Sequence, residues 1–319
     1  FSGIGSQAKA FERLSRKRNF QLNVLKTCEW DVHAIVAYDY IHNGSALDKR
    51  TLELKREEFN LFEDFVYRES GIRFNVINEI ILKSHIFSSM KEKGIEEVYD
   101  YYKLVSSNKD CLEEFLESIT TNLTKFFRTQ SDFNLLKEFV LPKLLKSKRK
   151  SEQIRIWCAG CSTGEEAYSI AITCLETPNI KAENIKIFAT DLSTHSIIEA
   201  KEGKYNSDKI ECINRRYLKK YFDKTSANIY SVKSVVKDLI TFDCHNLMHK
   251  SPHYNIDIIF CRNVLIYFDS ESVKLTVNRF YDILNRNGFL FIGHTESLFG
   301  LDTKFKSANI NNSIVYTKQ

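Results

Sequence analysis

Hydrophobic residues recur every three or four positions through most of the stretch from about residue 52 to 145. The pattern is clear in "FNLFEDFVYRESGI", "VINEIILKSHIFSSMKEKG", "VYDYYKLV", "CLEEFLESIT" and "DFNLLKEFVLPKLL". This spacing places apolar side chains along one face of an α-helix. We therefore predict a small helical domain in this region.

The pattern changes from Ile154 onward. Short apolar runs alternate there with helical segments: "IRIW", "EEAYSIAITCLE", "IKIFAT", "STHSIIEAKEG", "IDIIF", "DSESVKLTVNRFYDIL" and "GFLFIG". Such alternation is typical of a parallel sheet with crossover helices, which predicts an α/β fold. The basic stretch "KSKRK" at 146–150 follows Pro142 and reads as a solvated linker, so we place the domain boundary there, with domains at 51–145 and 146–319.

Composition narrows the class of protein. The 319 residues are 43% hydrophobic and 13% aromatic, enough for a large core and two or more domains. The sequence contains neither an apolar run of membrane-spanning length nor a charged-then-apolar leader, so we expect a cytoplasmic protein. A net charge of +5 is modest for this length, and we expect no nucleic-acid partner.

Eight cysteines are scattered along the chain, mostly inside apolar patterns, and we interpret them as reduced core residues. Cys158 and Cys161 have CxxC spacing, but a structural zinc site would lack two of its four ligands. We predict no metal site. A thioredoxin-like redox pair remains a weaker alternative, because this pair also lies between a strand and a helix.

The stretch after the first predicted strand of the α/β region, "WCAGCSTGEEAYS", suits a nucleotide-like ligand. Ala159, Gly160 and Gly164 are small enough for a ligand to approach the backbone before a helix begins near Glu165. The next strand ends in Asp191, where related folds hold ribose hydroxyls. The chain lacks both G-x-G-x-x-G and G-x-x-x-x-G-K-[ST], which favours S-adenosylmethionine, a ligand without a pyrophosphate, over NAD or ATP.

Five blocks together carry a family resemblance. They are "TTNLTKFFR", "IRIWCAGCSTGEEAYSIAI", "FATDLSTHSIIEAKEGKY", "IIFCRNVLIYFD" and "GFLFIGHTES". In this order they resemble the CheR-type methyltransferases of bacterial chemotaxis, over residues 52 to 319. The resemblance implies a Rossmann-like methyltransferase domain with a small β-subdomain at about 205–244, preceded by a small all-α domain. It also implies methyl transfer from S-adenosylmethionine to glutamate side chains of chemotaxis receptors, with S-adenosylhomocysteine as product.

The resemblance also assigns residues. Asn122, Thr124 and Arg128 would reach the cofactor, Ala159 and Glu165 its methionine portion, Asp191 its ribose, and Asn246, Leu247 and Asn263 its adenine and neighbouring groups. Arg128 and Tyr267 would be catalytic, with Tyr267 near the methyl group. A glutamate is already ionised at neutral pH, so catalysis is chiefly positioning. We therefore interpret His294 as structural rather than as a general base.

Members of this family that bind a receptor's carboxyl-terminal pentapeptide have a glycine-bearing loop in the β-subdomain. The matching stretch here, "YFDKTSANIYSVK" at 221–233, has no glycine. We therefore expect no tethering to such a tail. The family resemblance further implies a monomer.

The first 50 residues resemble instead the opening of cytosine-5 DNA methyltransferases. They would supply a cofactor turn at 1–5 and an acidic residue, Glu29. None of the three prolines is followed by cysteine, so the Pro-Cys nucleophile of that family is missing. We interpret this segment as a truncated or fused gene fragment of unknown function.

Two alternatives stay open on the sequence alone. The chain could be a non-catalytic, cofactor-sensing module that binds receptors, or a remnant of a DNA cytosine methyltransferase fusion. The presence of both Arg128 and Tyr267 argues against the first, and the missing Pro-Cys against the second.

Overall fold

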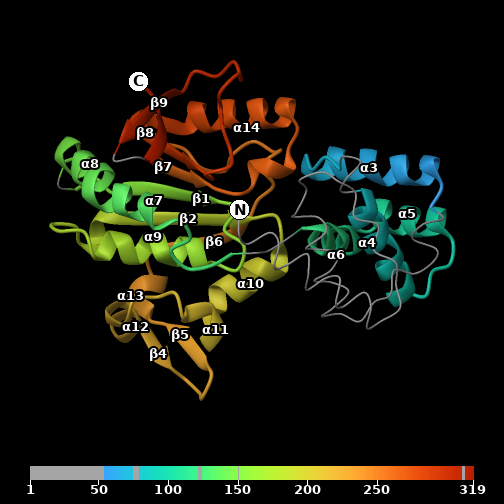
Figure 1. Ribbon diagram of the computed structural model, residues 1–319, viewed down its shortest axis with the longest axis horizontal. Coiled ribbons are helices and arrows are strands. Elements are labelled where there is room, and N and C mark those ends of the chain that lie inside the picture. The colour runs from blue at the N-terminus through green and yellow to red at the C-terminus, as the bar shows by residue number, and fades with distance from the viewer. Residues whose placement is uncertain (1–53, 75–78, 121–123, 150, 311–312) are drawn as a thin grey trace, which may run out of the picture. The chain divides into compact units, whose positions relative to one another are not determined.

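The computed structural model describes residues 54–74, 79–120, 124–149, 151–310 and 313–319 (Figure 1). The predictions for residues 1–50, including the cofactor turn at 1–5 and Glu29, lie outside the described residues, as does the predicted cofactor contact of Asn122.

Between residue 54 and residue 120, the described part of the chain forms four helices: α3 (Arg56–Ser70), α4 (Glu79–Glu92), α5 (Val98–Ser107) and α6 (Lys109–Ile119). Their apolar faces meet in one cluster that includes Phe62, Tyr101 and Phe115. The Phe62 ring lies 5.7 Å from that of Tyr101 and 5.5 Å from that of Phe115. Burial of these aromatic faces stabilises the four helices as one packed unit.

The helical segment 130–147 packs elsewhere than the sequence pattern suggested. It forms α7 (Gln130–Leu135), a π-helical segment (Leu136–Val140) and α8 (Leu141–Ser147). Its apolar residues, Phe133 and Leu136 among them, belong to the core that contains the sheet, not to the cluster of α3 to α6. Helical periodicity predicts a buried face but does not say which partner covers it.

A seven-stranded sheet forms the centre of the second region, in the order β6-β2-β1-β7-β8-β10-β9. The strands are β1 (Ile154–Ala159), β2 (Ile185–Asp191), β6 (Ile240–Cys244), β7 (Ile256–Cys261), β8 (Leu284–Ile292), β9 (Lys306–Ile310) and β10 (Ser313–Thr317). The first five in spatial order are parallel, and β10 runs antiparallel to both β8 and β9.

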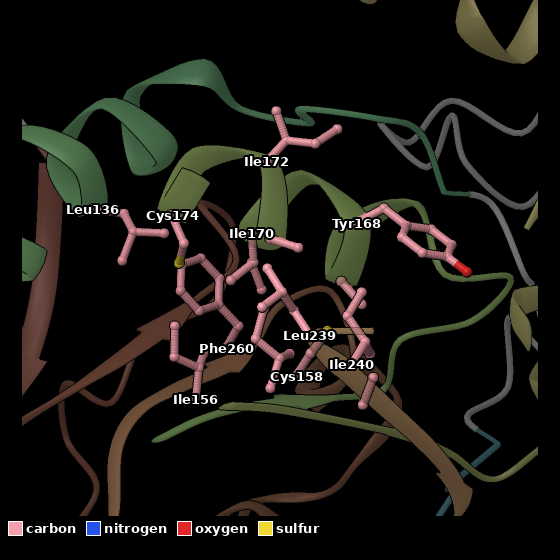
Figure 2. Close-up of a cluster of buried hydrophobic side chains, with 14 of the residues drawn as sticks. Leu136, Ile156, Cys158, Tyr168, Ile170, Ile172, Cys174, Leu239, Ile240 and Phe260 are labelled. Atoms are coloured by element: carbon pink, nitrogen blue, oxygen red, sulfur yellow. The ribbon is translucent and has the colours of Figure 1, made fainter. Parts of the chain in front are cut away.

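Both faces of the sheet are covered, as its unbroken apolar strands require. Ile156 and Cys158 of β1 face the core that contains α9 (Glu165–Leu175), part of which Figure 2 shows. Trp157 and Ala159, the alternate residues, belong to a second core with α14 (Ser270–Ile283). Figure 1 shows α9 and α14 on opposite sides of the sheet.

A small β-subdomain follows α10 (Thr194–Glu202). It contains β3 (Lys204–Asn206), α11 (Ser207–Ile210), α12 (Arg215–Tyr221), β4 (Phe222–Lys224), β5 (Ile229–Val232) and α13 (Ser234–Lys237). Its strands form a separate sheet in the order β3-β5-β4, with antiparallel pairs. Two 3₁₀ turns, Ala182–Asn184 and Leu265–Tyr267, complete the described elements. In the described part of the chain, no helix combines the length and apolar character needed to cross a membrane.

Candidate functional site

A cavity opens where the carboxyl ends of the parallel strands meet the end of the helical region. Segments that follow β1, β2, β6 and β7 line it, together with residues near the ends of α3 and α6 and with the turn before α7. Strand β1 pairs with β2 on one side and β7 on the other. The cavity therefore lies at the switch point of the sheet, where the chain segments that leave the strands on the two sides of β1 turn in opposite directions. Ligands of open α/β sheets bind at such a point.

Seven of the predicted site residues line this cavity: Thr124, Arg128, Asp191, Asn246, Leu247, Asn263 and Tyr267. They come from four separate parts of the chain, and the fold brings them together. Asn246 also supports the protein itself, since its side-chain amide donates to the carbonyl of Glu69 and its Oδ1 accepts from the Met248 N–H at 2.9 Å.

The turn after β1 requires glycine at position 160. Gly160 has a φ of 87°, and its N–H donates to the Thr190 carbonyl at 2.8 Å. A Cβ at this position would lie 2.3 Å from Cγ2 of Val264, closer than real contacts allow. The bare backbone therefore lets the segments after β1 and β7 lie close together in the cavity wall.

Asp191 ends β2 with its carboxylate oriented by the backbone. Oδ2 accepts from the Ser162 N–H at 2.7 Å and Oδ1 from the Ser193 N–H at 3.0 Å. Burial raises the pKa of this carboxyl, and the N–H groups of Ser193 and Ser162 oppose that rise. A carboxylate can accept about four hydrogen bonds, so this group can also accept from a ligand hydroxyl.

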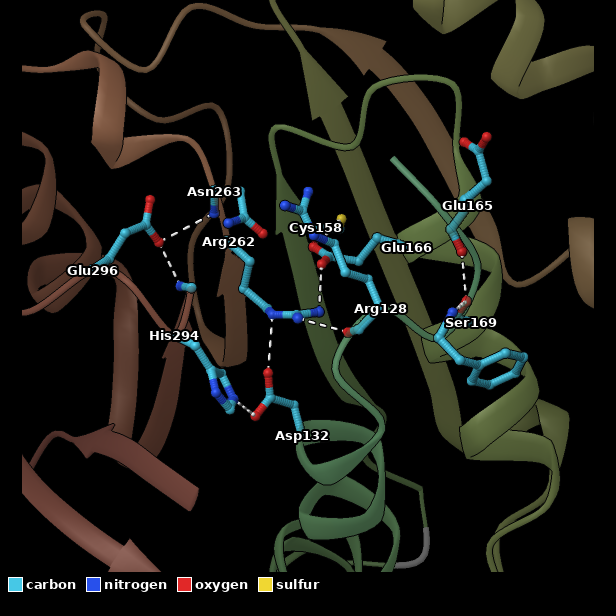
Figure 3. A network of polar contacts seen from close by, with 12 residues as sticks. Arg128, Asp132, Cys158, Glu165, Glu166, Ser169, Arg262, Asn263, His294 and Glu296 are labelled. Atoms are coloured by element: carbon cyan, nitrogen blue, oxygen red, sulfur yellow. Dashed lines mark hydrogen bonds and ion pairs between the residues drawn. The ribbon is translucent and has the colours of Figure 1, made fainter. Parts of the chain in front are cut away.

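A buried ionic network lies beside the cavity (Figure 3). The guanidinium of Arg262, with a side chain that is 1% exposed, lies 2.9 Å from Glu166 Oε2 and 3.0 Å from Asp132 Oδ2. Asp132 Oδ1 is in turn 3.3 Å from His294 Nε2. Burial raises the pKa of both Glu166 and Asp132, whereas the Arg262 charge lowers it. One buried cation thus offsets part of the cost of burying two acids.

The same arginine fixes the turn that carries Arg128. Arg262 Nη2 donates to the Arg128 carbonyl at 2.6 Å. Phe127 and Thr129 on either side have positive φ, 51° and 64°. The Phe127 N–H donates to Ser169 Oγ at 2.9 Å. Backbone bonds from two directions therefore hold this strained turn in place at the cavity.

Two predicted contacts, Ala159 and Glu165, are not among the cavity-lining residues of the described chain. The Glu165 side chain is fully buried, and its carboxylate accepts from Thr163 Oγ1 at 2.7 Å and from Lys209 Nζ at 2.9 Å, which ties α9 to α11. Glu166 lines the cavity instead. Consecutive helical residues point about 100° apart, so only one of the two glutamates can face the ligand side.

Sequence reasoning missed Ser162, His245 and Arg262, which line the cavity, whereas Gly160, expected to let a ligand approach the backbone, also lines it. Arg262 stands directly before the predicted Asn263, inside the block "IIFCRNVLIYFD". The only available signal was therefore an arginine in an otherwise apolar strand end. Such a residue needs buried partners, and these cannot be identified from local sequence.

The Cys158 and Cys161 thiols are poorly suited to act as nucleophiles. Burial raises the pKa of the Cys158 and Cys161 thiols well above the ordinary value, with nearby carboxylates adding to the shift. Thiols held protonated in this way are poor redox groups, which argues against the redox alternative. Among the described residues, no cluster of His, Cys, Asp and Glu side chains could hold a metal ion.

Comparison with known proteins identifies the family. The model for "CheR methyltransferase, SAM binding domain" matches residues 122–314, and that for "CheR methyltransferase, all-alpha domain" matches residues 57–120. The chain belongs to the CheR methyltransferase family. The matches confirm the predicted resemblance and the predicted order of an all-α part and an α/β part that binds S-adenosylmethionine (SAM). This CheR-family chain is thus a SAM-dependent methyltransferase.

Relatives match over most of their length. A chemotaxis protein methyltransferase of Borreliella burgdorferi is 35% identical over 259 residues, which cover 78% of this chain and 91% of that protein. The chemotaxis protein methyltransferase of Escherichia coli is 30% identical over 263 residues, 80% of this chain and 89% of that one. Among solved structures, a SAM-dependent methyltransferase of Methanosarcina mazei is 12% identical and covers 47% of this chain and 55% of that one, with a TM-score of 0.28, too low to add to the argument.

The cavity of this CheR-family chain fits the cofactor chemically. Gly160 leaves the backbone open where a side chain would collide, and Asp191 offers an oriented carboxylate for two neighbouring hydroxyls. The apolar side chains of Ile72, Leu247 and Phe268 line the same cavity and suit a flat heterocycle.

Proposed function

We propose that this chain transfers the methyl group of SAM to glutamate side chains of chemotaxis receptors and forms glutamate methyl esters. The observation that carries the proposal is that Arg128 and Tyr267 line one cavity together with Asp191. A guanidinium and a phenol are the groups that a carboxylate acceptor needs, because both can donate hydrogen bonds to it. The names of the relatives, chemotaxis protein methyltransferases, support the choice of receptors as substrate.

When bound, SAM supplies an activated methyl group on a sulfonium. The chain's own residues then have a positioning task. We propose that Asp191 accepts hydrogen bonds from the ribose hydroxyls, while Thr124, Asn246, Leu247 and Asn263 enclose the rest of the cofactor. Arg128 holds one oxygen of the substrate carboxylate and Tyr267 donates a hydrogen bond close to the reacting groups. Holding two reactants in line replaces a bimolecular encounter with a local step.

The proposed reaction needs no general base. A glutamate carboxylate, with an ordinary pKa of about 4.3, has already lost its proton at neutral pH. His245 lines the cavity, but burial lowers its pKa, so at neutral pH it is uncharged. His294, an exposed residue, lies against Asp132 at the edge of the buried network. This arrangement suits an acceptor that arrives ionised.

We also propose that the chain recognises receptors without gripping a carboxyl-terminal tail. In the β-subdomain, the loop between β4 and β5 uses its own backbone donors: the Thr225 and Ser226 N–H groups donate to the Ile229 carbonyl at 3.0 and 3.3 Å. The central strand β5 is paired on both sides. These bonds occupy two backbone donors of the loop, which supports the tail-independent proposal.

The test is incubation with methyl-labelled SAM and receptor-containing membranes, followed by mild base. Carboxyl methyl esters hydrolyse in base, so we expect volatile labelled methanol. Label that survives base on the receptor would contradict ester formation. Label found on DNA would contradict the proposed acceptor altogether.

A further inference from the structure

The segment that follows β7 supplies four cavity-lining residues within six positions: Arg262, Asn263, Val264 and Tyr267. Its backbone is irregular, since Asn263 has a φ of 59° and a 3₁₀ turn spans Leu265–Tyr267. A non-glycine residue in the left-handed region is strained, and surrounding contacts must hold it there. The position of the Tyr267 phenol therefore depends on what fixes this backbone.

One side chain from a distant segment makes those contacts. Glu296, in the loop after β8, accepts at Oε2 from the Asn263 N–H at 3.1 Å and at Oε1 from the Ile266 N–H at 3.2 Å. Oε2 also accepts from the Gly293 N–H. Figure 3 shows the Glu296 carboxylate directed at the backbone beside Asn263. Glu296 thus joins both ends of the turn between Asn263 and Tyr267 to the end of β8.

The fit around this carboxylate is close. A Cβ at position 293 would lie 2.7 Å from Glu296 Oε2 and 3.0 Å from the Asn263 nitrogen. Three N–H donors converge on two oxygens, an arrangement for which an ionised carboxylate is the suitable acceptor. The Cys261 thiol next to this turn has a pKa raised well above its ordinary value, first by burial and then by the Glu296 charge.

We infer that Glu296 is a positioning residue for methyl transfer, which sets the turn that presents Asn263 to the cofactor and Tyr267 to the reacting groups. The turnover test of this inference rests on the proposed function, whereas the contacts of Glu296 do not. Glu296 does not itself line the cavity in the described chain, so it acts through the backbone that it holds.

The test compares Glu296→Gln and Glu296→Ala with Glu271→Gln, a matched change at an exposed position in the first turn of α14. Glutamine keeps one acceptor oxygen and the side-chain length, whereas alanine removes both oxygens. We expect turnover of labelled receptor to fall roughly 10- to 100-fold in Glu296→Ala, because small displacements of reacting groups are costly, and less in Glu296→Gln. The KM for the receptor should change little, and Glu271→Gln should match wild type.

A double-mutant cycle separates positioning from general destabilisation. If Glu296 acts through Tyr267, Glu296→Gln should lower turnover much less in the Tyr267→Phe background than in the wild-type background. Equal losses in both backgrounds, unchanged turnover in Glu296→Ala, or loss of the cooperative thermal transition in Glu296→Gln would overturn the inference. Failure of the wild-type chain to form base-labile ester would instead overturn the proposed function. In that case, the affinity of the Glu296 variants for S-adenosylhomocysteine, measured by calorimetry, would still test whether Glu296 positions Asn263.

Discussion

At the scale of single residues, the positions of charged side chains decide what the cavity can bind. The sequence was enough to predict that Asp191 ends a strand at the ligand-binding edge. It was not enough to choose between Glu165 and Glu166, because the choice depends on where α9 begins and how it is rotated. The partners of Arg262 lie 96 and 130 residues away, at Glu166 and Asp132, and only the folded chain brings them together.

Asp191 provides the first prediction. Asp191→Ala should weaken S-adenosylhomocysteine binding tenfold or more, because hydrogen bonds to a charged acceptor contribute about 1.5–3 kcal/mol each. Calorimetric titration of the folded variant measures this change. Unaltered affinity would remove Asp191 from the proposed ribose contact.

The pKa of Asp191 adds a pH dependence. Burial raises this pKa, so on acidification the carboxylate takes up a proton at a higher pH than an ordinary aspartate and becomes a weaker acceptor. We expect wild-type affinity for S-adenosylhomocysteine to fall as the pH is lowered into that range. In Asp191→Asn, which cannot titrate, affinity should be low and this component of the pH dependence absent. An identical acid profile in both proteins would contradict the assignment.

Arg128 separates binding from chemistry. Arg128→Ala should lower turnover more than it lowers cofactor affinity, because the proposed partner of its guanidinium is the substrate carboxylate. Arg128→Lys should restore little activity, since an ammonium lacks the planar pair of donors. Steady-state kinetics together with calorimetry give both numbers. Normal turnover with weaker cofactor binding would reassign Arg128 to the cofactor.

At the scale of elements, the alternation of apolar runs and helical segments was a sufficient guide to the parallel sheet. Strand β1 is buried on both faces and reads as a nearly continuous apolar run. The partner of segment 130–147 could not be predicted in the same way. Its helices present an apolar face that fits either the helical cluster or the sheet, and only tertiary packing decides between them.

His253 makes the sheet sensitive to acid. Its ring stacks on that of Phe188 in β2, with the ring centroids 4.4 Å apart, and meets the Trp157 ring of β1 edge-on, with the centroids 5.3 Å apart. Its Nε2 atom is buried without a hydrogen-bond partner among the described residues. Burial lowers its pKa from 6.5 to about 4. Between pH 6.5 and about pH 4, the unfolded chain takes up a proton at this histidine that the folded chain does not. The free energy of unfolding therefore falls as the pH is lowered through this interval, and His253 does not change it above pH 6.5.

We therefore expect the free energy of unfolding to drop by ~1–3 kcal/mol on account of His253 as the pH falls from 6.5 to 4. His253→Phe keeps an aromatic ring but cannot titrate, so its loss over this interval should be smaller. Denaturant unfolding at several pH values measures the difference, with His249→Phe as the exposed control. Equal acid losses in wild type and His253→Phe would contradict the prediction.

At the scale of the molecule, the cavity depends on contacts between the helical region and the sheet region. Ile72 forms a backbone bridge with Phe268, and the Arg73 N–H donates to the Tyr267 carbonyl at 3.0 Å. These bonds place the end of α3 against the turn that carries Tyr267. The order of the five sequence blocks predicted the family over residues 52–319, but such long-range contacts have no signature in local sequence.

The β-subdomain gives a prediction about partners. We expect a free receptor carboxyl-terminal pentapeptide to show no micromolar binding, because the loop between β4 and β5 lacks glycine and uses its own backbone donors. A receptor fragment without its tail should be methylated as well as the intact fragment. Micromolar pentapeptide binding that is lost when residues 223–230 are altered would show that the tail is gripped after all.

The most direct test of the whole account is to map the transferred methyl group on a receptor cytoplasmic fragment by peptide mass spectrometry, after reaction with wild-type protein and with Arg128→Ala. The account predicts methyl esters on glutamate side chains with the wild-type protein and a strong reduction at the same positions with the variant. Methyl groups on lysine, cysteine or other non-carboxylate side chains, or equal esterification by Arg128→Ala, would contradict it.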